Sequence, residues 1–387
     1  MAGPRRQSAC IRYTRDYVAI PSVNPMRRTD LDPAIAGERR YAEHLRAQLR
    51  ALGLDAELVG DSKRPSLVAE ARVADAGETV LVASHLDTVP VDGMEIEPFD
   101  PRLADGRVFG RGSCDTKSGM AALVAALERV LAHRRLRRNV IVVGEADEEL
   151  GSTGVRDVIA HLGAQRPDWV IATEPTELRC VTRHKGIVHA ELRATGVACH
   201  SSEPARGKSA IVALARAVLA LDELAAELGT RVDPHLGAAT LSVGRCGGGS
   251  ATNIVPDDAW LLLDRRLLPD EDDESVRAEL EGALAKHDLP EVRVEWCTLE
   301  KAPLATPADD PSVRALQAAL AEAGLETTPS SVAFGTDAGE FSARGWPGVV
   351  FGPGSIAQAH TRDEWVAVEQ VEAASAVFER ILSTRGG

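Results

Sequence analysis

Short apolar runs alternate with longer amphipathic segments in the first half of the chain, and this alternation limits the folds open to it. Three runs have the length and composition of buried strands: residues 79–84, 139–143 and 169–172. Apolar residues at helical spacing fill residues 117–132 and 152–161, which lie between these runs. Strands that alternate with helices in this way predict an α/β fold, in which helices cover both faces of a sheet.

The pattern changes after about His184. Around residues 188–194, apolar and polar side chains alternate, which is typical of a strand with one buried and one wet face. The elements that follow are helices at 208–228 and 273–286 and strands near 239–243, 259–266 and 292–297. Two helices on a largely antiparallel sheet make a compact α+β domain of ordinary size. We therefore predict a discontinuous catalytic domain, residues 1–184 and 299–387, with a helix-flanked mixed sheet and a smaller domain inserted over residues 185–298.

The composition is that of a soluble globular protein long enough for two domains, with 387 residues, 44% of them hydrophobic. Acidic residues outnumber basic ones by 58 to 44, which argues against a nucleic-acid or anionic-membrane partner. Residues 1–21 contain no continuous apolar stretch, and no run approaches the roughly 18 residues of a membrane span. The six cysteines are scattered and indicate reduced thiols. We expect a cytoplasmic protein.

His85-Leu86-Asp87 follows the first of the buried runs. Ligands bind at the carboxyl ends of strands in open α/β sheets. Residues two apart in a strand lie on the same side, so Asp87 can reach the His85 imidazole and select its tautomer, as carboxylates do behind metal-bound histidines. The motif alone is also compatible with two polar residues that cap a strand.

Asp115 lies in a glycine-rich stretch, Gly110-Arg111-Gly112-Ser113-Cys114-Asp115, immediately before a predicted helix. Glycines allow a carboxylate to be presented from backbone conformations that other residues resist. A phosphate-binding loop is the rival interpretation, but the spacing does not match G-x-x-x-x-G-K-[ST].

The run Asp147-Glu148-Glu149 follows the second buried strand. Adjacent carboxylates repel one another unless cations or protons relieve the repulsion. The alternative is a solvated helix N-terminus, where the helix dipole favours acidic residues. Because the run follows a buried strand, as His85 does, we expect it at the same edge of the sheet.

Glu174 follows the third strand, and His360 lies near the C-terminus. With His85, Asp115 and Glu149 they make two histidines and three acids, which we expect to converge from five strand ends. Five ligands with a shared carboxylate fit two divalent ions about 3.5–4 Å apart. Mixed histidine and carboxylate ligation favours zinc, with cobalt or manganese as alternatives.

These motifs resemble those of the metal-dependent hydrolases that include acetylornithine deacetylase, succinyl-diaminopimelate desuccinylase, glutamate carboxypeptidase and aminoacylase. The similarity runs from Ile20-Pro21-Ser22-Val23-Asn24-Pro25 to the final helix predicted at residues 366–382. It rests on SHLDTVP, GRGSCDTKSGMAA, ADEELGS, ATEPT and AHTRDEW, which are together highly specific.

The resemblance implies a role for each residue at a matching position. Asp115 bridges two ions, His85 and Glu174 complete one site, and Glu149 and His360 complete the other. Asp87 orients His85. Glu148 is the general acid–base: it takes a proton from a metal-bridging water and delivers it to the leaving amine.

In the inserted domain, the resemblance implies that His200 stabilises the oxyanion of the reacting carbonyl in a neighbouring subunit's active site. It makes Asn253 a substrate contact. In Asp264-Arg265-Arg266, it selects Arg266 for a bidentate grip on a substrate carboxylate. For His200 a purely structural role is the alternative, and for Arg266 an exposed charge on a sheet.

The segments that contain Gly335 and Gly354 look most like those of acetylornithine deacetylases, which makes both glycines substrate-binding candidates. Asp337 and Glu340 are extra acids that either bind a cationic substrate amine or cap the following helix. The resemblance implies a homodimer through the inserted domain.

The expected substrate is a small N-acylated amino acid, acetylornithine first. The alternatives are a metallo-carboxypeptidase or dipeptidase, a succinyl-diaminopimelate desuccinylase, and, in another class, a non-catalytic binding protein. The last predicts a missing ligand or base, and none is missing.

Overall fold

The computed structural model describes residues 7–74 and 76–385, which divide into two compact units. The first comprises the described residues up to Thr182, Thr306–Ser330 and those from Thr336 onward, and the second comprises Arg183–Ala305 and Ser331–Gly335. Part of the expectation of a cytoplasmic protein rests on residues 1–6, which lie outside the described residues. Among the residues described, no helix has the length and apolar character to cross a membrane.

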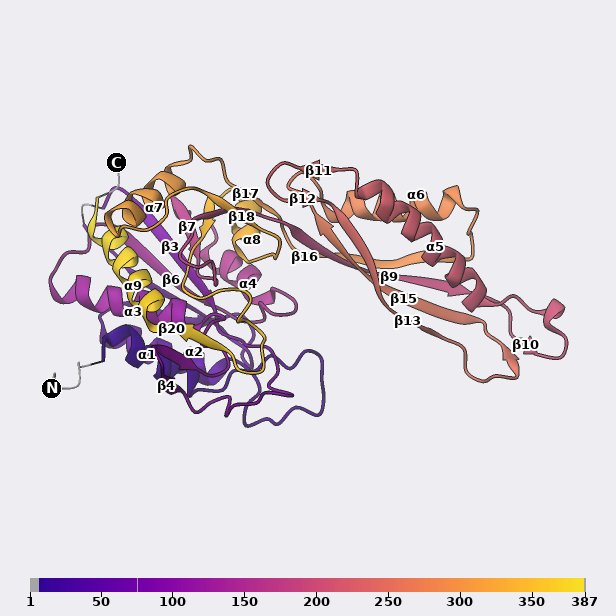
Figure 1. Ribbon diagram of the computed structural model, residues 1–387, viewed down its shortest axis with the longest axis horizontal. Helices are drawn as coiled ribbons and strands as arrows, with labels where there is room; N and C mark the ends of the chain where they lie inside the picture. The colour runs from indigo at the N-terminus through magenta and orange to yellow at the C-terminus, as the bar shows by residue number, and fades with distance from the viewer. Residues whose placement is uncertain (1–6, 75, 386–387) are drawn as a thin grey trace. The chain divides into compact units, whose positions relative to one another are not determined.

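The first unit is built on a mixed sheet (Figure 1). Within this unit its strand order is β1-β2-β6-β3-β7-β19-β8. The central strands are parallel to one another: β6 (Asn139–Glu145), β3 (Thr79–His85), β7 (Trp169–Ala172) and β19 (Gly348–Val350). The outer strands are β1 (Asp55–Val59), β2 (Ser66–Ala71) and β8 (Val181–His184). β17 (Leu304–Ala305) belongs to the second unit, and β18 (Ser330–Val332) begins at the last residue of the segment Thr306–Ser330. The predicted helix-flanked mixed sheet is confirmed.

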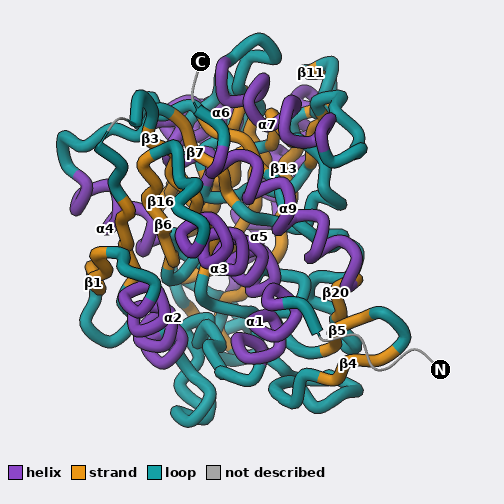
Figure 2. Tube along the Cα trace, turned by 90° about the vertical axis from the view of Figure 1, so that its left-hand side faces the viewer, coloured by secondary structure: helices purple, strands orange, loops and turns teal. Residues whose placement is uncertain are grey.

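Helices cover both faces of this sheet because each central strand is apolar on both sides. Val80 and Val82 of β3 pack in the larger core with α1 (Ala9–Val18), α2 (Arg39–Ala51), α3 (Lys117–Ala132), α7 (Pro311–Glu322) and α9 (Val368–Ser383). Leu81 and Ala83 pack in the second core with α4 (Thr153–Leu162) and α8 (Ala338–Ala343). Figure 2 shows α1, α3 and α9 as neighbouring helices, and they pack directly on one another.

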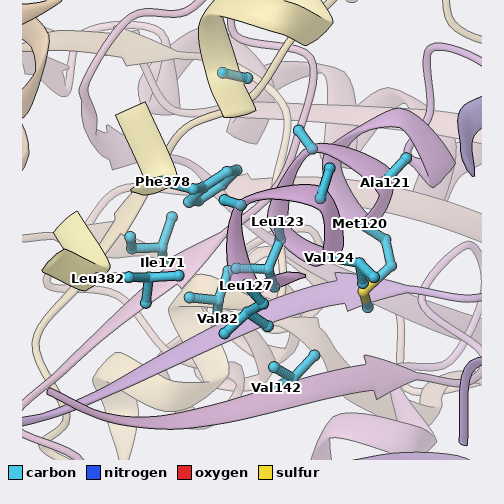
Figure 3. Packing of buried hydrophobic residues seen from close by; sticks show 14 of the residues in the cluster. Val82, Met120, Ala121, Leu123, Val124, Leu127, Val142, Ile171, Phe378 and Leu382 are labelled. Atoms are coloured by element: carbon cyan, nitrogen blue, oxygen red, sulfur yellow. The ribbon is translucent and has the colours of Figure 1, made fainter. Parts of the chain in front are cut away.

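The larger core centres on α3, which is buried along most of its length. In Figure 3, Leu127 faces Val82 and Val142 of the sheet, and Phe378 and Leu382 of α9 complete the cluster. This packing holds the beginning of α3, and the loop before it, against the carboxyl ends of the parallel strands.

A separate small sheet joins β4 (Arg102–Ala104), β5 (Arg107–Phe109) and β20 (Trp365–Ala367) in the order β20-β5-β4. It corrects the predicted final helix, since Val366 is in β20 and the helix begins at Val368. β20 pairs antiparallel with β5, and this pairing brings the segment after His360 beside the glycine-rich loop.

The second unit contains an antiparallel sheet in the order β13-β15-β9-β16. Its strands are β9 (Gly186–Thr195), β13 (Thr240–Gly248), β15 (Asp258–Leu267) and β16 (Val292–Lys301), and its helices are α5 (Ala210–Leu228), α6 (Asp273–Lys286) and the 3-10 turn Pro204–Arg206. Short ladders pair β10 (Cys199–His200) with β14 (Ile254–Val255) and β11 (Val232–Asp233) with β12 (Gly237–Ala238). β16 continues past residue 297, so the unit extends beyond the predicted boundary at residue 298 to Ala305.

Candidate metal centre

The carboxyl ends of three parallel strands bring most of the predicted ligands together. His85 is the last residue of β3, Glu148 and Glu149 follow β6, and Glu174 follows β7. These strands are hydrogen-bonded neighbours in the order β6-β3-β7, so the side chains that follow them share one edge of the sheet.

The imidazole of His85 is buried and held from both sides. Its Nδ1 donates to the backbone carbonyl of Asp87 at 2.9 Å, and its Nε2 lies 2.9 Å from Oδ1 of Asp115 and 4.0 Å from Oε2 of Glu174. The bond at Nδ1 selects the tautomer that leaves Nε2 to a metal once the Nε2 proton is lost.

The two carboxylate oxygens of Asp115 face two different histidines. Oδ1 contacts His85 Nε2, and Oδ2 lies 3.3 Å from Nε2 of His360. His360 Nε2 is also 3.2 Å from Oε2 of Glu149. Ligand atoms of His85, Asp115 and Glu149 all lie within 4.8 Å of one another. A carboxylate whose two oxygens face different histidines is able to bridge two cations.

Protons on the histidines offset the repulsion among these acids in the metal-free chain. Burial by itself lowers the pKa of His85, but hydrogen bonds to Asp115 and Asp87 outweigh it and raise the pKa well above its usual value. Hydrogen bonds to Asp115 and Glu149 raise the pKa of His360 to about 10. Burial raises the pKa of Glu149. Such a cluster of buried acids, neutralised only by protons, suits divalent cations.

Two of the predicted ligands lie in loops and not at the strand ends that we expected from the sequence. Asp115 does not follow a strand of the main sheet: it lies in the loop between β5 and α3. His360 lies in the loop between β19 and β20 with a φ of 61°, and its side chain is 49% exposed. The expectation of five strand ends is therefore wrong, because long-range packing rather than strand polarity brings these two side chains to the edge.

Asp87 also differs from its strand-based description. β3 ends at His85, so Asp87 reaches the imidazole from a loop, with Oδ1 3.6 Å from Nδ1. Its carboxylate accepts from the backbone amides of Glu148 and Glu149, each at 3.1 Å. Asp87 therefore fixes the backbone of the acidic loop as well as facing His85.

Sequence reasoning missed the polar residues behind this loop. The Asn24 amide donates to Oδ2 of Asp87 at 2.7 Å and to Oδ1 of Asp147 at 3.0 Å. Arg64 bridges Asp147, at 2.9 Å, and Glu38, at 2.5 Å. Asn24 lies in the Ile20–Pro25 motif, which carried the resemblance, but nothing in that motif indicated its partners 63 and 123 residues away.

The chain is similar to known proteins over most of its length. Residues 81–384 match the family described as peptidase family M20/M25/M40. The chain belongs to this family. It is 32% identical to the acetylornithine deacetylase of Myxococcus xanthus over 356 residues, covering 88% of this chain and 90% of that protein. It is 34% identical to the succinyl-diaminopimelate desuccinylase of Burkholderia multivorans over 393 residues, covering 97% of this chain and 98% of that protein.

Solved structures share the fold across almost the whole chain. An M20 family metallo-carboxypeptidase from Sulfolobus solfataricus superimposes with a TM-score of 0.81 at 22% identity, covering 97% of this chain and 99% of that one. A Bacillus subtilis protein described as a dinuclear metal binding peptidase of the M20 family superimposes with a TM-score of 0.65 at 16% identity, covering 97% of this chain and 96% of that one. Membership of the family makes this chain a metal-dependent hydrolase.

The family resemblance placed three substrate contacts in the inserted domain, and the second unit contains them. Pairing of β10 with β14 holds His200 beside the segment of Asn253, whose carbonyl accepts from the Ser201 amide at 3.0 Å. Arg266 is ion-paired with its neighbour Asp264, 2.8 Å from Nε to Oδ1. A substrate carboxylate would therefore have to compete with Asp264 for this guanidinium.

The remaining candidates have clear local environments. Gly335 belongs to the second unit, where a Cβ would come within 3.2 Å of the Lys185 carbonyl. Gly354 has a φ of 94°, and a Cβ there would meet Sγ of Cys114 at 2.5 Å. Asp337 is buried, and its Oδ1 accepts from Ser152 Oγ at 2.8 Å. Glu340 lies 3.7 Å from Arg156.

Proposed function

We propose that this hydrolase cleaves the amide bond of small N-acylated amino acids, in the manner of acetylornithine deacetylase, with two divalent ions and Glu148 as general acid–base. The observation that carries the proposal is the position of Asp115, whose two oxygens lie between His85 and His360. A carboxylate with one oxygen toward each of two histidines fits a pair of ions better than a single one.

Each ion has a chemically suitable set of ligands. His85 and Glu174 would hold one, Glu149 and His360 the other, and Asp115 both. Nitrogen and carboxylate donors favour zinc, with cobalt or manganese as alternatives. When bound, the ions supply Lewis acidity and lower the pKa of water toward neutrality.

Glu148 is well placed in the chain to handle the proton. It is buried, and Asp87 holds its backbone amide, next to the proposed ligand Glu149. Its carboxylate would accept a proton from the attacking water as the water oxygen bonds to the carbonyl carbon. The C–N bond then breaks, and the same carboxyl group returns the proton to the amine nitrogen.

Substrate contacts would come from His200, Asn253, Arg266, Gly335 and Gly354, with His200 acting on the carbonyl in a partner subunit. The homodimer would form through the second unit. Its support is the outer strand β13, which pairs with β15 on one edge and has no partner on the other among the described residues, and exposed apolar side chains on α5: Ile211, Val212 and Leu219. We place the enzyme in the cytoplasm, where its cysteines would remain reduced.

The second candidate activity is removal of a succinyl group from diaminopimelate, which the 34% identity to a desuccinylase supports. A metallo-carboxypeptidase or dipeptidase activity uses the same machinery, and the fold shared with such enzymes supports it.

A hydrolysis screen of the zinc- and cobalt-loaded enzyme tests the proposal. It compares N-acetylornithine, N-succinyl-diaminopimelate, other N-acyl amino acids and dipeptides. We expect turnover of an N-acyl amino acid, and a loss of at least about 100-fold in kcat for Glu148→Gln with two ions still bound. Cleavage of dipeptides alone would move the assignment to a peptidase. Full turnover by Glu148→Gln would remove its role as the base.

A further inference from the structure

Glu364 is a buried carboxylate that the proposed reaction does not use. Its side chain is 1% exposed and accepts four hydrogen bonds. Oε1 accepts from the backbone amides of Cys114 at 2.9 Å and Asp115 at 3.1 Å. Oε2 accepts from the amide of Gly112 at 3.1 Å and from Arg111 Nη1 at 2.6 Å.

Burial raises the pKa of Glu364, while the hydrogen bonds around it favour its ionised form. Four donors converge on two oxygens, and an ionised carboxylate offers about four acceptor sites and no donor. Burying such a charge is costly unless it is paired and hydrogen-bonded, and Arg111 supplies the pairing. Glutamine would keep one acceptor oxygen but turn its NH₂ group toward two other donors.

The bonds of Glu364 connect the segments that carry two proposed ligands. Glu364 lies four residues after His360, and it binds the backbone amide of Asp115. The side chains of these two ligands lie 3.3 Å apart. Arg111 extends the connection, since its Nη2 donates to the carbonyl of Pro90 at 3.1 Å, in the segment that follows His85 and Asp87.

We propose that Glu364 is a positioning residue that sets the spacing between Asp115 and His360, and so the affinity for the ion shared by Asp115, Glu149 and His360. It acts through backbone amides and touches neither ion nor substrate. The inference rests on the proposed two-ion function. Partners behind metal ligands commonly change metal affinity by about 10- to 100-fold when removed.

The test is metal binding by Glu364→Gln in the full chain. Zn²⁺ and Co²⁺ are titrated by calorimetry and equilibrium dialysis, and the d–d absorption of bound Co²⁺ is recorded. We expect two ions per wild-type chain. In the variant we expect the ion held by Asp115, Glu149 and His360 to bind at least about tenfold more weakly. The other ion, which shares only Asp115 with it, should weaken by a smaller factor, and the Co²⁺ spectrum should lose the weaker site first.

The matched control is Glu379→Gln. Glu379 is a glutamate of α9 that is ion-paired with Arg129, at 2.6 Å, and with Arg135, at 2.5 Å, and among the described residues it has no hydrogen bond to a metal-centre loop. This control loses two ion pairs and should keep both metal ions. If Glu364→Gln does not fold, Arg111→Met takes its place: it leaves Glu364 its three backbone amides and should weaken the same ion by a smaller factor.

Two results would overturn the proposal: unchanged affinity for both ions in Glu364→Gln, or equal weakening of both. Either leaves the proposed function intact as long as the wild-type chain binds two ions and hydrolyses its substrate. A wild-type chain that binds no divalent ion would instead refute the proposed function.

Discussion

The amide of Asn24 stabilises two buried carboxylates, and its removal should be measurable as a loss of folding free energy. Asn24→Leu is nearly isosteric and removes the bonds to Asp87, at 2.7 Å, and Asp147, at 3.0 Å. Hydrogen bonds to charged groups contribute about 1.5–3 kcal/mol each. Asp147 keeps Arg64, and Asp87 keeps two backbone amides, so we expect a loss of about 2–4 kcal/mol rather than the full sum.

Asn24→Asp tests the electrostatic part of this stabilisation, because it replaces the donating amide with a carboxylate. It places a third carboxylate against two, so the folded-state pKa of the new group is raised above its unfolded value of about 3.9. Such a group binds more protons in the folded state, so the variant loses stability relative to wild type as the pH rises between those two pKa values. The loss grows by about 1.4 kcal/mol per pH unit. Below about pH 4 the added penalty is absent, and above the folded pKa it is complete.

The assay is urea unfolding of the metal-free wild type and both variants from pH 5 to pH 8. Asn139→Asp is the control, because the Asn139 side-chain oxygen accepts from the Val73 amide at 2.9 Å and a carboxylate can do the same. Its destabilisation should not grow with pH. The reasoning is refuted if Asn24→Leu costs less than about 1 kcal/mol, or if the deficit of Asn24→Asp is the same at pH 5 and pH 8.

Three further predictions concern a glycine, a histidine and the metal. Gly354→Ala should lower the free energy of unfolding by at least about 1 kcal/mol, because the residue has a positive φ and the added Cβ would meet Sγ of Cys114. Adding Cys114→Ala should recover part of this loss, as measured by denaturant titration. Hydrogen bonds to Asp264 and Glu300 raise the pKa of His189 to about 9. That stabilisation is complete below about pH 6.5 and lost as the pH rises through 9. It amounts to about 1 kcal/mol, because the side chain is 40% exposed and screened by solvent, and His189→Gln should flatten this part of the stability profile. Chelation should abolish hydrolysis and lower the melting temperature, and adding Zn²⁺ or Co²⁺ back should restore both; hydrolysis that persists after complete metal removal would contradict the mechanism.

Local pattern was enough for the central elements. The apolar run at Trp169–Ala172 and the helical segment Lys117–Ala132 have the predicted bounds. Their burial on both faces leaves a continuous apolar signature that needs no knowledge of partners. The predicted ligands were recognisable because His85 ends such a strand and Glu149 and Glu174 come within four residues of the ends of two others. Short outer elements such as β4, β5 and β20 were not predicted, since three-residue strands form only against partners distant in the chain.

Tertiary structure alone decided how the centre is held. Asp115 and His360 come from loops, and 245 residues separate them in the sequence, so strand polarity could not place them. Glu364 binds amides about 250 residues away, and Asn24 binds Asp147 across 123 residues. A single buried asparagine or glutamate has no periodicity, and its hydrogen-bond partners become defined only when the chain folds. Residue type and spacing thus indicated the chemistry, while the packing of α3 and α9 on the sheet brought those side chains within reach of one another.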